Sequence, residues 1–273
     1  MAPTIYDMHT HTDCSHDSRQ PIGALCAAAV AAGMAGVAVT NHSDTPYSHE
    51  NGDFARLERS IRTCREAAQQ YAGQLEILSG VEIGEPLWHP ENTRTVLGLG
   101  EYDVVLASVH GQLEDGVCVY LGDRDIPAWS KTRLDGYLRR YLSDLTEAAE
   151  TADYDILAHL DIPLRYINGK AGHGMELQNY ADLVDTVLRT VIRRGKTLEV
   201  NTSGLAAGWR CMPELAVMQR YYELGGRRIS VGSDAHASAN VACGLAQTVQ
   251  QLQAIGFTGQ TIYRKRQPVE IGF

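Results

Sequence analysis

The chain has 273 residues, of which 44% are hydrophobic and 21% charged, and its formal net charge at pH 7 is −9. This composition is typical of a globular protein with a sizeable core and excludes a disordered chain. The acidic balance and the dispersed basic residues argue against nucleic acid as a main partner. The longest apolar stretch, 24–39, is too short and too rich in Ala and Gly to span a bilayer, which argues against a membrane partner.

The first residues lack the basic and apolar pattern of a signal peptide. The six cysteines are scattered without CxxC pairs, which favours reduced thiols over a disulfide framework. We therefore expect a cytoplasmic protein, and because no linker interrupts the chain we expect a single domain over residues 1–273.

Hydrophobic runs and turn signals alternate along the chain in a rhythm of strand, helix and strand. Strands are expected at 5–11, 36–42, 75–82, 103–110, 155–161, 196–203 and 227–236. Helices are expected at 21–32, 53–71, 131–152, 179–194, 212–225 and 244–255. Seven strands with helices between them predict an α/β fold with parallel strands, and the length suits one α/β barrel.

Nearly every expected strand ends in a residue that can bind a metal. The strand endings are His9 and His11, His42, Glu82, His110, His159, Asn201, and Asp234 with His236. The carboxyl ends of parallel barrel strands share one face, where the active sites of such barrels lie. A lone histidine is usually a satisfied polar residue, but so many at strand ends favour a metal site because unpaired buried polar groups are costly.

Spacing adds detail to this hypothesis. Alternate residues of a strand point the same way, so His9 and His11 can face one ion, as can Asp234 and His236. Glu82 is the natural carboxylate to bridge two cations. Imidazole with carboxylate suits zinc, iron or manganese and does not select one of them.

These motifs resemble the polymerase and histidinol phosphatase (PHP) family of metal-dependent phosphoesterases. The matching stretches are HxH at 9–11, TNH at 40–42, GVE at 80–82, SVH at 108–110, AH at 158–159 and SDAH at 233–236. The resemblance implies a distorted, TIM-like (β/α)7 barrel with two to three divalent metal ions, Zn, Mn or Fe.

Carried over residue by residue, the resemblance implies three ligand sets. The first is His9, His11, Glu82 and Asp234; the second is Glu82, His110 and His159; the third is Asp17, His42 and His236. His16 and Asp13 are rival ligands beside Asp17, and the spacing alone does not separate them.

Three stretches resemble the histidinol-phosphatase group within the family: AHLDIPLRY (158–166), LEVNTSGL (198–205) and ISVGSDAHAS (229–238). This implies a small phosphorylated substrate, L-histidinol phosphate, and a step of histidine biosynthesis. Arg165 and Arg210, in the loops after the fifth and sixth strands, are the expected phosphate-binding residues, with His16 as a further substrate-binding candidate.

The expected mechanism is attack on phosphorus by a hydroxide held between two ions, with catalytic roles for Glu82, Asp234 and His236. Three ions would bring about six positive charges, so the site can be cationic inside an acidic protein. The acid that protonates the leaving group stays open among His236, Asp234 and metal-bound water.

Three alternatives remain open beside this reaction. The first is a phosphoesterase of the same family that acts on nucleotides or other small phosphate esters. The others are an amidohydrolase-like enzyme and a catalytically silent metal-binding module. Glu82 on the third strand and the DxH pair at 234–236 favour phosphoester hydrolysis over the amidohydrolase alternative. The oligomeric state also stays open.

Overall fold

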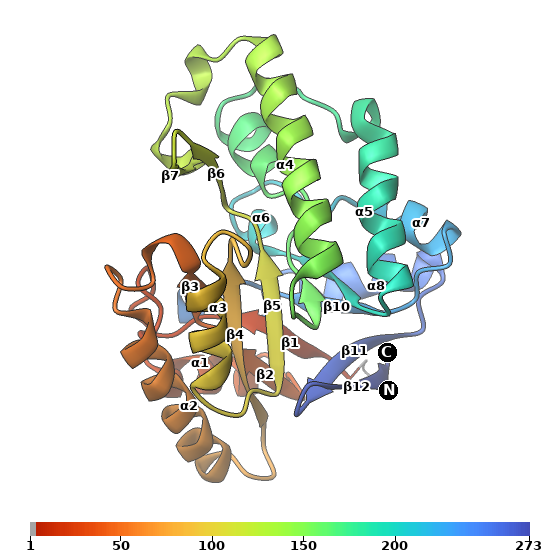
Figure 1. The fold of residues 1–273 in the computed structure, drawn as a ribbon. Helices are drawn as coiled ribbons and strands as arrows, with labels where there is room; N and C mark the ends of the chain where they lie inside the picture. The colour runs from red at the N-terminus through yellow and green to blue at the C-terminus, as the bar shows by residue number, and fades with distance from the viewer. Residues whose placement is uncertain (1–3) are drawn as a thin grey trace.

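A barrel of parallel strands forms the centre of the molecule in this computed structural model, which describes residues 4–273 (Figure 1). Its strands are β1 (Tyr6–Thr10), β2 (Gly36–Val39), β3 (His42–Asp44), β4 (Glu76–Gly84), β5 (Val104–Ser108), β8 (Ile156–Leu157), β9 (Thr197–Asn201) and β10 (Ile229–Gly232). They follow the order β1-β2-β4-β5-β8-β9-β10, and β3 pairs with β4 beyond the end of β2. A parallel bridge between Thr10 and Ala235 nearly closes the barrel. The expected barrel of seven strands is confirmed.

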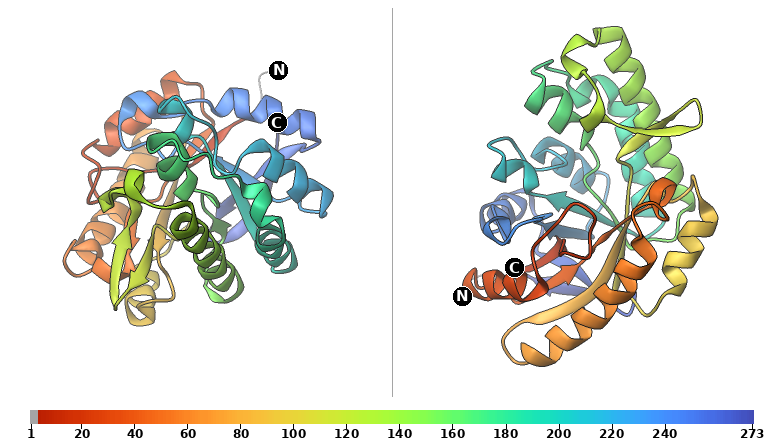
Figure 2. Two further views of the ribbon diagram at one scale, coloured as in Figure 1. Left: turned by 90° about the horizontal axis from the view of Figure 1, so that it is seen from above. Right: turned by 90° about the vertical axis from the view of Figure 1, so that its left-hand side faces the viewer.

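Helices surround the strands, as the view from above shows in Figure 2. They are α1 (Ile22–Ala31), α2 (Asp53–Gln70), α3 (Pro90–Gly98), α4 (Lys131–Thr151), α5 (Ala181–Arg193), α6 (Ser203–Ala206), α7 (Leu215–Glu223) and α8 (Leu245–Ile255). All six expected helices are present, and α3 and α6 are additional. Among residues 4–273, the helices include none with the length and apolar character needed to cross a membrane.

Two hairpins lie outside the barrel strands and were not expected. They are β6 (Gly111–Glu114) with β7 (Val117–Tyr120), and β11 (Gly259–Arg264) with β12 (Gln267–Gly272). Each turns at two residues with positive φ, Asp115-Gly116 and Lys265-Arg266, which matches the twist of a tight hairpin. The first hairpin leads to residues beside the site described below.

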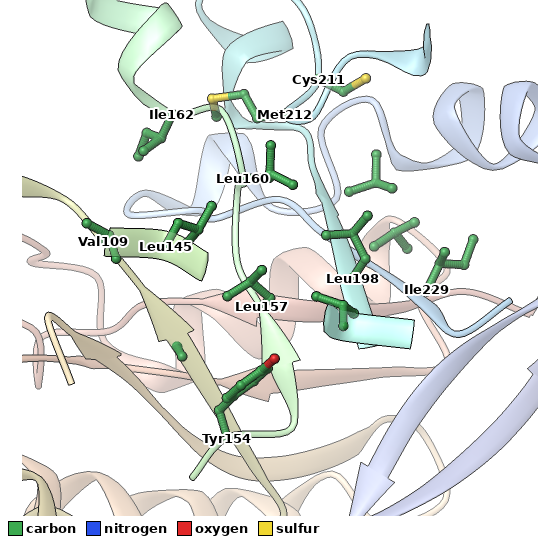
Figure 3. Close-up of a cluster of buried hydrophobic side chains, with 14 of the residues drawn as sticks. Val109, Leu145, Tyr154, Leu157, Leu160, Ile162, Leu198, Cys211, Met212 and Ile229 are labelled. Carbon is green, nitrogen blue, oxygen red and sulfur yellow. The ribbon is translucent and has the colours of Figure 1, made fainter. Parts of the chain in front are cut away.

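The core has two parts that together leave one end of the barrel polar. The larger part fills the space between strands and helices, where Leu145 of α4 packs near Leu157 and Leu198 (Figure 3). The smaller part fills the barrel interior and includes Met8, Leu106, Ile156, Ile262 and Tyr263. Because β11 supplies Ile262 and Tyr263, the C-terminal hairpin plugs the amino-terminal end of the barrel. The polar residues of the interior gather at the opposite end.

Candidate metal centre

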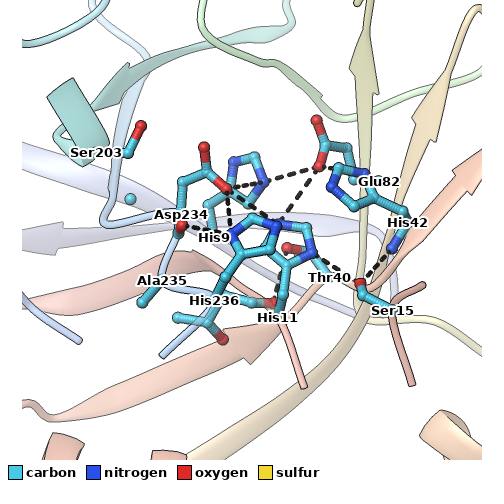
Figure 4. Close-up of polar contacts among 12 residues, drawn as sticks. His9, His11, Ser15, Thr40, His42, Glu82, Ser203, Asp234, Ala235 and His236 are labelled. Carbon is cyan, nitrogen blue, oxygen red and sulfur yellow. Dashed lines mark hydrogen bonds and ion pairs between the residues drawn. The ribbon is translucent and has the colours of Figure 1, made fainter. Parts of the chain in front are cut away.

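Six histidines meet at the carboxyl ends of the barrel strands, and Figure 4 shows four of them, His9, His11, His42 and His236. The six are His9 in β1, His11 after it, His42 at the start of β3, and His110, His159 and His236 in the loops after β5, β8 and β10. The ring of His11 lies 4.1 Å from that of His236 and 4.3 Å from that of His42, measured between centroids. The structure therefore brings together all six histidines that the strand endings singled out.

Glu82 lies at the centre of this cluster and is fully buried. Its Oε2 lies 3.0 Å from His9 Nε2 and 3.1 Å from His42 Nδ1. Its Oε1 lies 2.9 Å from His159 Nε2 and 3.1 Å from His110 Nε2. Each carboxylate oxygen thus faces a different pair of imidazoles, which is the arrangement that a bridging ligand requires.

Asp234 completes a compact donor group on the β1 side of Glu82. Its Oδ1 lies 3.2 Å from His11 Nε2 and 3.7 Å from His9 Nε2. Ligand atoms of His9, His11 and Asp234 all lie within 4.8 Å of one another, as do those of His42, Glu82 and His110. Both groups have the size of a metal site.

Asp17 is the acidic residue of the first loop that reaches the cluster. Its Oδ2 lies 2.9 Å from His236 Nε2 and 3.6 Å from His42 Nε2. Asp13 instead pairs with Arg59 at 3.1 Å, away from the histidines. His16 lies at the edge of the cluster with its Nε2 4.0 Å from Asp44 Oδ2. Of the three, Asp17 is therefore the one whose carboxylate lies beside two histidines of the cluster.

Three residues that the sequence did not single out for these roles contact the outer nitrogens of the imidazoles. Glu199 Oε1 lies 2.7 Å from His9 Nδ1, and Ser15 Oγ lies 3.0 Å from His11 Nδ1. Asp44 Oδ1 lies 3.2 Å from His110 Nδ1. These contacts hold each ring with its Nε2 toward Glu82 or Asp234, as ligating histidines are held in metalloproteins.

The carboxylates and several histidines of the cluster stabilise each other's charged forms. Burial alone would raise the pKa of Glu82, but the charges of His42, His9 and His110 hold that pKa well below its ordinary value. Burial lowers the pKa of His42, yet the charge of Glu82 outweighs it and raises that pKa to about 9. For His11, burial and the neighbouring His236 and His42 lower the pKa to about 3. The carboxylates are thus ionised donors, and in the absence of metal the neighbouring carboxylates favour a protonated His42, whereas His11 stays neutral.

Several buried nitrogens of the cluster have no hydrogen-bond partner, and these are His11 Nε2, His42 Nδ1, His159 Nδ1 and His236 Nε2. Buried polar atoms without partners are costly in protein interiors. Three of the four, those of His11, His42 and His236, face the carboxylates of the cluster. The donor set of imidazoles and carboxylates fits divalent metal binding, although it does not define the number or identity of the ions.

A cavity of about 230 Å³ opens directly onto the cluster. His16, Asp17 and Arg165 line it together with Tyr120 and Tyr166. The guanidinium of Arg165 donates to Ser203 Oγ at 3.0 Å and to Tyr166 Oη at 3.1 Å. Two of the three substrate-binding candidates, Arg165 and His16, therefore lie at this cavity.

Arg210 is not brought to this cavity. Its side chain lies over the ring of Trp209 and pairs with the buried Asp161 at 2.7 Å. An antiparallel bridge between Asn201 and Met212 folds the loop back, so that Arg210 lines a separate cavity of about 500 Å³ between α5 and α7. In this structure Arg210 serves as the partner of a buried carboxylate.

Parallel barrels with histidines and carboxylates at the carboxyl ends of their strands form a class of metal-binding hydrolase scaffolds. The chain belongs to the PHP domain family, whose model matches residues 7–203.

Similar proteins extend the likeness over almost the whole chain. A Thermotoga maritima protein named "Probable histidinol-phosphatase" is 26% identical over 259 residues, 93% of each chain. A protein of the same name from Deinococcus radiodurans is 28% identical over 279 residues, 97% of this chain and 99% of its own. The crystal structure of histidinol phosphate phosphatase from Lactococcus lactis has a TM-score of 0.79 at 18% identity, covering 97% of this chain and 99% of that one. The fold is therefore shared with that structure.

Proposed function

We propose that this protein is a metal-dependent phosphomonoesterase that hydrolyses L-histidinol phosphate to L-histidinol and phosphate, a step of histidine biosynthesis. The observation that carries this proposal is the cluster around Glu82, which opens into a cavity that bears Arg165. The names of the two relatives support the substrate. The Lactococcus lactis protein of the same fold was crystallised with zinc, L-histidinol and phosphate.

The proposed centre holds two to three divalent ions, Zn, Mn or Fe. We assign the first position to His9, His11, Glu82 and Asp234, the second to Glu82, His110 and His159, and the third to Asp17, His42 and His236. The two oxygens of Glu82 support a bridging role, because they face different histidine pairs. Bound ions would supply a water nucleophile active near neutral pH and positive charge for the phosphoryl oxygens.

Side chains around the cavity can bind the phosphate group and take part in proton transfer during phosphoester hydrolysis. The planar guanidinium of Arg165 can donate two parallel hydrogen bonds to a phosphate, and Ser203 and Tyr166 hold it at the cavity. Asp234 can accept a hydrogen bond from the attacking water, because its carboxyl stays ionised. With the third ion bound, His236 would use its Nε2 as a ligand and its Nδ1 for the carbonyl of Asp234, so water held by the ions is the proton donor for the leaving alkoxide that agrees with this ligand set.

The cavity and the cysteines also support proposals for the substrate class and the cellular location. A cavity of about 230 Å³ suits a small phosphate ester rather than a nucleic acid. All six cysteines are free, which supports a cytoplasmic location. We propose that residues 1–273 act as one domain around this centre.

A panel of phosphate esters tests the substrate assignment. Purified protein, loaded in turn with Zn, Mn and Fe, is given L-histidinol phosphate, nucleoside monophosphates and an aryl phosphate, and kcat/KM is measured from phosphate release. We expect L-histidinol phosphate to be preferred by about 100-fold or more, since a matched amine and imidazole add several hydrogen bonds. Equal turnover of all esters would overturn the substrate assignment, and no turnover of any would favour a silent metal-binding module.

A further inference from the structure

Three polar side chains at alternate positions along β9 and its continuation lie beneath the metal centre, and none of them is a proposed ligand. They are Glu199, Asn201 and Ser203, which we call the β9 array. Glu199 and Asn201 are almost completely buried, and Ser203 is partly buried and contacts Arg165, which lines the cavity. Alternate residues of a strand point to one side, so Glu199 and Asn201 face the interior, and Ser203, the first residue of α6, joins them through its hydroxyl, which donates to Asn201 Oδ1.

Glu199 joins two of the strands that carry proposed ligands. Its Oε1 lies 2.7 Å from His9 Nδ1, and its Oε2 accepts the backbone N–H of His159 at 2.7 Å. The backbone of His159 has a φ of 22°, a left-handed conformation that costs about 1–3 kcal/mol for a non-glycine residue. Glu199 therefore fixes the ring of His9 and stabilises the strained backbone that presents His159.

Gly232 on the neighbouring strand β10 leaves the space in which this contact is made. A Cβ at position 232 would lie 2.5 Å from His9 Cβ and 2.7 Å from Glu199 Oε1. Both distances are shorter than real Cβ contacts, so any side chain at this position would push Glu199 and His9 apart. The local packing is thus built around the pair of Glu199 and His9.

Asn201 and Ser203 continue the connection toward the cavity. Asn201 Nδ2 donates to Glu199 Oε2 and to Asp234 Oδ2, both at 3.3 Å. Asn201 Oδ1 accepts the hydroxyl of Ser203 at 2.7 Å, and Ser203 Oγ accepts the guanidinium of Arg165 at 3.0 Å. An unbroken chain of hydrogen bonds therefore runs from His9 to Arg165, and Figure 4 shows Ser203 on the same side of the centre as Asp234.

We propose that the β9 array consists of positioning residues, with Glu199 setting metal affinity through His9 and His159 and Ser203 setting phosphate affinity through Arg165. A carboxylate that accepts the outer N–H of a ligating imidazole fixes its tautomer and makes its inner nitrogen a stronger donor. A guanidinium held by a hydroxyl keeps the orientation in which it can bind two oxygens of a phosphate. The phosphate half of this inference rests on the proposed function, whereas the metal half does not.

The first experiment titrates the metal-stripped protein with Zn²⁺ and Mn²⁺ in a competing chelator and follows binding by calorimetry. Glu199→Gln keeps the size of the side chain and removes its charge, and we expect metal affinity to fall by about 10- to 100-fold. Gly232→Ala should lower it in the same direction. Glu76→Gln, at the opposite end of β4, is the matched control and should leave the affinity unchanged. Affinity of Glu199→Gln within about twofold of the parent would overturn the role of Glu199.

The second experiment measures binding of inorganic phosphate to the metal-loaded protein. Ser203→Ala should weaken phosphate binding by about 3- to 10-fold while leaving metal affinity unchanged, and Ser203→Thr should restore it. Ser230→Ala is the control, because the Ser230 hydroxyl is buried in β10 without a partner. Unchanged phosphate binding in Ser203→Ala, or an equal loss in Ser230→Ala, would overturn the role of Ser203.

These two readouts separate the inference from the proposed function. If the protein does not turn over L-histidinol phosphate but Glu199→Gln still lowers its metal affinity, the substrate assignment fails and the positioning role of Glu199 stands. Thermal unfolding of each variant shows whether it is folded. Because Ser203 is only partly buried, its variants decide the inference for Arg165 even if Glu199→Gln does not fold.

Discussion

Glu82→Gln is the substitution with the largest expected effect on the metal centre. The carboxylate places one oxygen 3.0 and 3.1 Å from nitrogens of His9 and His42, and the other 2.9 and 3.1 Å from nitrogens of His159 and His110. The amide keeps the volume but has one oxygen and no charge, so it can serve only one of the two sides. Removing one partner of a buried charge pair costs about 3–5 kcal/mol.

The effect on catalysis follows from the metal position that the amide cannot serve, because a bound ion contributes several kcal/mol of charge stabilisation in the transition state. About 4 kcal/mol corresponds to a factor of about 10³ in kcat/KM, because each 1.36 kcal/mol is tenfold. The assay is phosphate release from L-histidinol phosphate at saturating metal, with metal content measured by mass spectrometry. Glu76→Gln is the matched control: it lies on the same strand, but it pairs with Arg264 at the far end. Activity of Glu82→Gln within about threefold of the parent would refute the assignment of Glu82 as the central ligand.

Four further outcomes are expected. Arg165→Ala should raise KM for L-histidinol phosphate by about 10- to 100-fold with a smaller change in kcat, because a charged hydrogen bond contributes about 1.5–3 kcal/mol; unchanged KM in steady-state kinetics would exclude Arg165 from phosphate binding. Arg210→Ala leaves the buried Asp161 unpaired, so the melting temperature should fall by about 6 °C or more; Arg220→Ala, which removes an exposed pair with Asp185, should cost much less, and equal losses would contradict the structural role of Arg210. The pKa of His42 is raised to about 9, so the pairing of protonated His42 with Glu82 stabilises the metal-free protein fully below the unfolded pKa of about 6.5, and this contribution is lost as the pH rises toward 9. Metal binding must displace the proton of His42, so calorimetry in buffers of different ionisation enthalpy should show proton release that declines toward pH 9. Metal binding without proton release would contradict this assignment of His42. Adding metal at about 1,000 times its Kd should stabilise the stripped protein by about 4 kcal/mol, raising its melting temperature by about 8–16 °C; no shift in a thermal scan would show that the cluster does not bind the ion.

The sequence was most informative where strand geometry determines position. His9 and His11 alternate on one strand, and His110 and His159 each follow a short apolar run, so the shared face of a parallel barrel was enough to bring them together. Glu82 was expected at the end of its strand but lies inside β4, which continues to Gly84 and pairs with β3. The position of its carboxylate was correct, since the extra residues lengthen the strand beyond the site.

Loop residues were harder to place, because their positions depend on contacts far away in sequence. Spacing in the sequence does not separate Asp13 from Asp17 as a ligand. In the structure Arg59 of α2 pairs with Asp13, whereas Asp17 contacts His236. Arg210 was expected to bind phosphate, but the bridge from Met212 to Asn201 reverses its loop and its side chain pairs with Asp161 instead. Contacts between residues so far apart in the sequence cannot be predicted from the local hydrophobic periodicity.

Two features did have a signal that the sequence analysis missed. Glu199 alternates with the apolar Leu198 and Val200 along β9, and a buried acid there needs a partner, which His9 provides. Asp115-Gly116 is a strong hairpin turn, flanked by the strands β6 and β7. Reading the interior face of each strand, as well as its end, would have found Glu199.

The most direct test of the central claim is turnover of L-histidinol phosphate by one protein sample before and after metal removal. We expect chelation to about 0.1 equivalents of metal or less to lower the activity to about 1% or less, and about two to three equivalents of Zn, Mn or Fe to restore it. A stripped protein that hydrolyses L-histidinol phosphate at the original rate would contradict the account, because the cluster around Glu82 would then have no part in the reaction.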